Sequence, residues 1–132
     1  MNWRLLAPLA LPGPVIGALT VAGVFPRGAD RWVWLVVVAA AAVLIARREP
    51  RRAIKHGALI GFWNGATATL IQALWMDPLL ANNPWMVEAF SRQPKGFDME
   101  FFLFMLVPFI GVAGGAVTAL LSILFVRVRN SG

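Results

Sequence analysis

The sequence predicts an all-α integral membrane protein, a bundle of four transmembrane helices with a short interfacial helix in its outer loop. Hydrophobic residues make up 59% of the 132 residues, and the mean hydropathy is +0.71. Charged residues make up only 14%, against about a quarter in soluble domains. The charges fall between long apolar runs. These runs predict a single transmembrane domain over 1–132, with spans at about 5–25, 29–46, 57–76 and 101–126.

The first run, 5–25, is interrupted by four residues that disfavour a regular helix: Pro8, Pro12, Gly13 and Pro14. Proline inside a helix removes a hydrogen bond and clashes with the preceding turn, but it is tolerated in a first turn. The span is therefore either kinked and continuous or broken at Pro12-Gly13-Pro14, and the sequence leaves both open. A signal peptide is a third interpretation, with a poor cleavage site at 20–22.

The other three runs differ in how easily they cross about 30 Å of hydrocarbon, which takes about 20 residues. The second run has no charge over 32–46, and a start near Ala29 with snorkelling by Arg31 and Arg47 lengthens it. The third, 57–76, is long enough as it stands. The fourth would extend about 39 Å as a helix. We therefore expect it to tilt, to kink at Pro108 or to protrude.

A basic loop between the second and third spans predicts the orientation of the chain. It contains Arg47, Arg48, Arg51, Arg52 and Lys55. Basic residues are retained on the cytoplasmic side of membrane proteins. With this loop inside, eight of the twelve basic residues lie on the cytoplasmic side, together with both termini. We expect the protein in the bacterial inner (plasma) membrane.

The outer loop, 77–100, contains a segment with helical periodicity. Apolar residues of the 85–92 segment recur at helical spacing, and Glu88 and Arg92 lie on the opposite face. This pattern predicts a short amphipathic helix that lies on the outer membrane surface or caps the bundle. Asp98 is in position to cap the fourth span.

Small residues recur every four positions on three of the four spans. The predicted packing residues are Gly13, Gly17, Gly57, Gly61, Gly65, Gly111 and Gly115. Lipid gives no hydrophobic drive for helix association, so close backbone approach at small residues supplies the contact. The pattern predicts a tightly packed bundle or packing against the helices of a partner.

Polar residues within the third span include Asn64, Thr67 and Gln72. Their spacing places Asn64 and Gln72 on one helix face. An amide in hydrocarbon must be hydrogen-bonded, so this face points toward protein or water. One interpretation is interhelical hydrogen bonding, with partners on Thr20, Thr118 or Ser122. The other is a polar permeation path or a site for a lipid head group.

The inventory of reactive groups is small: one histidine, no cysteine and no tyrosine. His56 is a conceivable cofactor ligand, but beside Lys55 and Arg52 we expect a solvated interfacial residue. We therefore predict no catalytic residue, cofactor or metal. Nucleic acid is not an expected partner, because the basic residues lie at the ends of apolar runs.

The sequence favours a non-enzymatic accessory or scaffolding subunit, within a larger membrane complex or a homo-oligomer. The expected partners are membrane lipid and other membrane-protein subunits or a second copy of the chain. The alternative is a small channel or facilitator lined by Asn64, Gln72 and threonines. The sequence does not identify the partner, its stoichiometry or a transported substrate.

Overall fold

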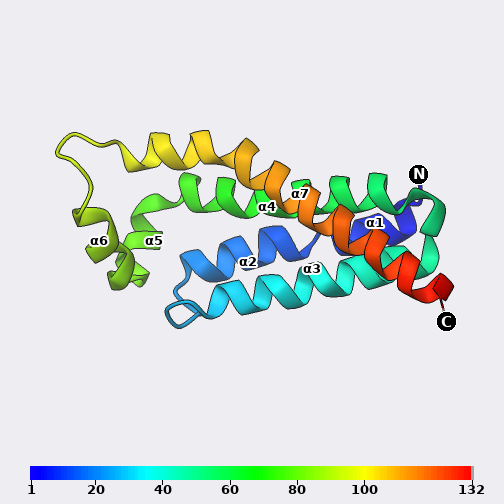
Figure 1. Cartoon of the computed structure of the whole chain (residues 1–132). Coiled ribbons are helices and arrows are strands. Elements are labelled where there is room, and N and C mark those ends of the chain that lie inside the picture. Colours follow the sequence, from blue (N-terminus) through cyan, green and yellow to red (C-terminus); the bar gives the residue numbers. More distant parts are fainter. Residues whose placement is uncertain (132) are drawn as a thin grey trace.

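The computed structural model describes residues 1–131, and this part of the chain is helical without strands. The elements are α1 (Trp3–Leu9), α2 (Pro12–Val21), α3 (Ala29–Arg48), the 3₁₀ turn η1 (Pro50–Arg52), α4 (Ala53–Leu74), α5 (Met76–Asn82), α6 (Pro84–Ser91) and α7 (Met99–Ser131). The long helices lie side by side (Figure 1). Both termini lie at the end of the bundle that holds the α3–α4 connection, and α5 and α6 lie at the opposite end (Figure 1).

Three segments are long and apolar enough to cross a membrane: Trp3–Val21, Ala29–Arg48 and Met99–Ser131. Most of their residues are not buried within the protein, the buried share being 33%, 22% and 28%. Large apolar side chains on the outside include Trp32, Val36 and Phe109, each more than 60% exposed. The all-α class is therefore confirmed, and the exposed apolar faces suit a lipid environment.

The helix expected at 57–76 is α4, which begins earlier and ends at Leu74. Asn64, Gln72 and the glycines lower its hydropathy, and it is not among the three segments apolar enough to cross a membrane on their own. It contacts α1, α2, α3, α5 and α7. Its buried positions are Ala53, His56, Gly57, Ile60, Gly61, Asn64, Gly65, Ala68, Thr69 and Ala73. The long helix that is not apolar enough to cross a membrane on its own is thus the one most enclosed by protein.

The first segment is broken. α1 ends at Leu9 and α2 begins at Pro12, so the break lies at Ala10-Leu11, just before the expected position. Pro12 and Pro14 have no N–H with which to continue the hydrogen bonds of α1. The segment also ends at Val21 instead of residue 25, because Gly23 adopts a positive φ of 71° in the following turn.

α7 is a continuous helix of 33 residues, longer at both ends than the expected 101–126. Pro108 lies inside it without ending it, and the ribbon changes direction along its length (Figure 1). At 1.5 Å per residue the helix is about 50 Å long. The predicted N-cap is confirmed, since the Phe101 N–H donates to Asp98 Oδ1 at 3.0 Å.

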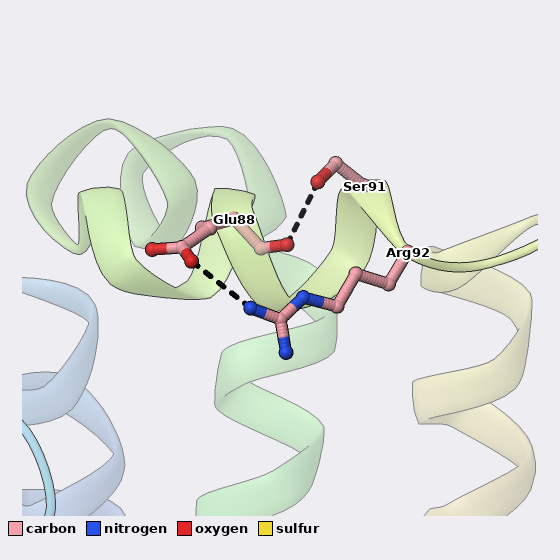
Figure 2. A network of polar contacts seen from close by, with 3 residues as sticks. All are labelled: Glu88, Ser91 and Arg92. Carbon is pink, nitrogen blue, oxygen red and sulfur yellow. Dashed lines mark hydrogen bonds and ion pairs between the residues drawn. The ribbon is translucent and has the colours of Figure 1, made fainter.

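The connection between α4 and α7 contains two short helices instead of one. α6 matches the predicted amphipathic segment within one residue, whereas α5 was not expected. Met86 of α6 is buried against Met76 and Leu79 of α5. On the exposed side of α6, Arg92 Nη2 donates to Glu88 Oε1 at 3.0 Å (Figure 2). The apolar face of α6 therefore packs on protein, and its charged face is solvated.

Candidate functional site

The side chain of Asn64 joins α4 to the break between α1 and α2. Asn64 is 3% exposed. Its Oδ1 accepts from the Gly13 N–H at 2.9 Å, and its Nδ2 donates to the Leu9 carbonyl at 2.8 Å. In an uninterrupted helix the Gly13 N–H would bond the Leu9 carbonyl directly. The Asn64 amide therefore lies between the Gly13 N–H and the Leu9 carbonyl and forms a hydrogen bond with each.

A second side chain of α4 forms a hydrogen bond at the same break. Trp63 Nε1 donates to the Ala10 carbonyl at 3.1 Å. In a regular helix that carbonyl would accept from residue 14, but Pro14 has no N–H. The sequence pattern of the third span did not predict this contact of Trp63. We call Asn64, Trp63 and their three backbone partners the amide junction.

Glycine allows the close approach of α2 to α4 at the amide junction. A Cβ added to Gly13 would lie 2.5 Å from Asn64 Cα, and one added to Gly17 would lie 2.9 Å from Ala68 Cα. Both neighbours are backbone atoms that cannot move aside. An alanine at either position would therefore separate the two helices and lengthen the hydrogen bonds of the junction.

The remaining predicted packing glycines lie between α4 and α7. The three on α4 face α7, where a Cβ on Gly57 would lie 2.8 Å from Ala119 Cα. The same addition at Gly61 would overlap the Gly114 carbonyl oxygen. The two on α7 face Phe62 and Ala58 of α4: Gly111 and Gly115. All seven glycines thus make contacts within this chain.

The hydroxyls proposed as partners of Asn64 bond elsewhere. Thr20, Thr118 and Ser122 each donate to the carbonyl four residues earlier in their own helix. That part of the prediction is wrong, because the break in the first segment offers stronger partners than a hydroxyl. Thr67 also bonds its own helix, through the Trp63 carbonyl at 2.7 Å. Gln72 is half-buried and makes no hydrogen bond to the described residues.

Two asparagines of the α4–α7 connection, for which the sequence predicted no such contact, cap the far end of α2. Asn83 is 3% exposed, and its Nδ2 donates to the carbonyls of Thr20 and Leu79 at 2.9 and 2.8 Å. Asn82 Nδ2 donates to the Val21 carbonyl at 3.0 Å. The last carbonyls of a helix have no partner within it. Side-chain amides thus form hydrogen bonds with backbone groups at both ends of α2.

A groove runs along the bundle between α3, α4 and α7, with a volume of about 310 Å³. We call it the lateral groove. Its lining is largely apolar and includes Trp34 and Val38 of α3 and Ala113 and Val117 of α7. Asn64 and Gln72 also line it. The Asn64 amide is already hydrogen-bonded within the amide junction, so Gln72 supplies the amide of this groove that has no hydrogen bond to the described residues.

The basic loop lies at the end of the bundle that holds both termini. All five of its predicted basic residues, Arg47, Arg48, Arg51, Arg52 and Lys55, are exposed. Arg129 of α7 donates to the carbonyls of Ala46 and Arg47 and so caps α3. Within residues 1–131 the basic side chains of this loop form no ion pair, unlike Arg92 and Glu88 in Figure 2.

His56 is fully buried, which corrects the expectation of a solvated residue. It lies one helical turn before the buried Ile60, on the enclosed face of α4. Neither ring nitrogen has a hydrogen-bond partner among the described residues. In residues 1–131, no group of three or more His, Cys, Asp or Glu side chains could hold a metal ion.

Comparison of the chain with protein-family models, with curated proteins and with solved structures finds no match.

Proposed function

We propose that the chain is an integral protein of a bacterial inner (plasma) membrane with four spans. α1 and α2 together form the first span, and α3, α4 and α7 form the other three. The basic loop and both termini would face the cytoplasm, and α6 would lie at the outer interface. The clustering of basic residues at the end that holds the termini supports this orientation. The enclosure of α4 by other helices supports its role as a span, because polar residues in a membrane face protein.

Within that membrane we propose a non-enzymatic accessory or scaffolding role. The hydrogen bonds of the buried polar side chains support this proposal. Apart from His56, each one bonds a backbone group: Thr20, Asn64, Thr69, Asn83, Thr118 and Ser122. These side chains are thus committed to backbone groups: Asn64 and Asn83 join one helix to another, and the four hydroxyls bond carbonyls of their own helices.

The lateral groove supplies the surface for a partner. The glycine faces are occupied within the chain, so a partner cannot use them. The groove is apolar, and exposed side chains of α3 and α7 flank it. A span of another membrane protein, or of a second copy, would bury these side chains and gain the dispersion contacts on which association in lipid depends.

The test compares two substitutions on neighbouring faces of α7. Ala113 lines the lateral groove, whereas Ala116 faces a different groove, and both are exposed. Tagged wild type, Ala113→Phe and Ala116→Phe are isolated in mild detergent, and the mass and composition of each complex are measured. We expect Ala113→Phe to lose the partner or second copy and Ala116→Phe to retain it. A wild-type protein that is monomeric and free of other proteins would contradict the proposal.

The alternative, a small channel or facilitator, is favoured by one observation: Gln72 presents an unbonded amide to the lateral groove. Flux of small solutes into liposomes that contain wild type or Gln72→Leu tests it. Loss of flux with retained assembly would support a channel. Substituting Asn64 would not discriminate, because its loss would also break the amide junction.

A further inference from the structure

A second groove lies between α4 and α7, on a different face of α7 from the lateral groove, with a volume of about 580 Å³. Its sides are apolar: Ala58, Leu59, Phe62, Val112, Gly115 and Ala116. Leu59, Phe62 and Val112 are 38%, 41% and 63% exposed, so the groove opens on the outer surface of the bundle. Met1 and Lys55 line it at the end of the bundle that holds the basic loop.

At that end the groove meets a polar pocket of about 320 Å³, because Met1 and Lys55 line both. The other lining residues of the pocket are Arg52 and His56. Arg52 and Lys55 are exposed, and neither forms an ion pair within residues 1–131. The nearby Glu49 accepts a hydrogen bond from Asn2 Nδ2 at 2.8 Å. Glu49 does not line the pocket, whose own lining presents two cationic side chains, Arg52 and Lys55.

Two further features of the pocket favour an anion. Arg52 is also the N-cap residue of α4, and no side chain caps this helix end. The first N–H groups of a helix and its dipole attract negative charge. The second feature is His56, whose ring is fully buried without a partner for either nitrogen. Such groups are rare in native proteins and call for a partner. A phosphate oxygen would accept a hydrogen bond from the ring.

We propose that an anionic phospholipid of the cytoplasmic leaflet binds here. Its acyl chain lies in the groove between α4 and α7, and its phosphate lies beside Arg52, Lys55 and His56. The continuity of an apolar groove with a cationic pocket matches an anionic head joined to an apolar tail. The proposal goes beyond the accessory role, and it rests on the proposed orientation, which places this end of the bundle at the cytoplasmic leaflet.

The charge of the head group is tested with the full-length protein in neutral detergent. Native mass spectrometry measures the binding of phosphatidylglycerol and of phosphatidylcholine to each variant. Arg52→Gln with Lys55→Gln is compared with Arg47→Gln and Arg48→Gln, which removes the same charge from exposed positions outside the pocket. For two basic residues near an anionic head group we expect roughly a thirtyfold loss of phosphatidylglycerol affinity. Equal losses in the two double variants, or equal binding of phosphatidylcholine to wild type, would overturn the proposal.

The acyl chain is tested with the two phenylalanine variants. Ala116→Phe fills the groove without changing the charge and should weaken phosphatidylglycerol binding, whereas Ala113→Phe should not. Loss of lipid and loss of a protein partner thus follow different variants, so the two proposals fail separately. Inorganic phosphate distinguishes a simple anion site. If it competes with phosphatidylglycerol at equal concentration, the lipid tail contributes nothing and the proposal is wrong.

His56 gives a readout that does not depend on a variant. It is the one histidine of the chain, so its ring nitrogens can be observed selectively by NMR. We expect phosphatidylglycerol, but not phosphatidylcholine, to shift these signals in the wild-type protein. Unchanged signals at saturating phosphatidylglycerol would show that no head group reaches the ring, which would contradict the proposed site.

Discussion

Substitution of Asn64 by leucine tests whether the amide junction holds the broken first segment to α4. The change keeps the approximate volume of the side chain and removes both of its hydrogen bonds. The Gly13 N–H and the Leu9 carbonyl would then lie between α2, α1 and α4 without a partner. We expect the protein to fold but to lose free energy of unfolding.

The size of the loss follows from the two hydrogen bonds. Hydrogen bonds between helices in a membrane contribute about 0.6 kcal/mol each on average, so two give a lower bound of about 1.2 kcal/mol. A buried group left without a partner costs about 1–3 kcal/mol, so two give an upper bound of about 6 kcal/mol. The N–H and the carbonyl can relax toward each other. We therefore expect a loss of about 2 kcal/mol, within these bounds.

The assay is reversible unfolding in mixed micelles by titration with a denaturing detergent, followed by tryptophan fluorescence. Gln72→Leu is the matched control, because it makes a similar change on the same face of α4 at an amide without a hydrogen bond. Hydrogen exchange at Gly13 adds a local readout and should accelerate only in Asn64→Leu. The reasoning is refuted if Asn64→Leu costs no more than Gln72→Leu and leaves Gly13 protected.

Three other substitutions probe features of the bundle. Gly61→Ala should cost about 1–3 kcal/mol in the same titration, because its Cβ would overlap the Gly114 carbonyl oxygen; an unchanged midpoint would contradict the close contact of α4 with α7. Asn83→Ala should cost about 1–2 kcal/mol and expose the α5–α6 connection to proteolysis, whereas the exposed Asn82→Ala should cost less. Glu88→Gln should change stability by less than about 0.5 kcal/mol, since the side chains of the Arg92–Glu88 pair are 76% and 65% exposed; a larger loss would mean that the pair is buried in an assembly.

The helices were predictable where the signal is local. Uncharged runs located α3 and α7 because length and apolar character alone determine which segments suit a membrane. The prolines predicted a possible break in the first segment. α5 was missed because Asp77 and Pro78 look like a loop start, and its stability comes from the packing of Leu79 against other elements.

The candidate site was less predictable because its contacts join distant parts of the chain. The sequence shows that prolines free backbone groups near residue 10, and that an amide at residue 64 requires partners. It does not show that Asn64 forms hydrogen bonds with Gly13 and Leu9, which lie 51 and 55 residues away in the sequence. His56 illustrates the same limit. Its charged neighbours suggested exposure, but the helical phase of α4 turns it toward the protein.

The hydrogen bonds at the break between α1 and α2 also bear on the order in which a nascent chain enters the membrane. With four spans, the backbone partners of Asn64 have been synthesised before α4 leaves the ribosome, whereas the α7 partners of Gly57 and Gly61 are synthesised later. The insertion machinery would therefore receive a helix of limited hydropathy together with an earlier segment that already satisfies its amide. A chain truncated before α7 should still insert α4, whereas one without α1 and α2 should not. In the proposed four-span arrangement, the order of the helices along the chain would thus help to stabilise a polar helix in lipid.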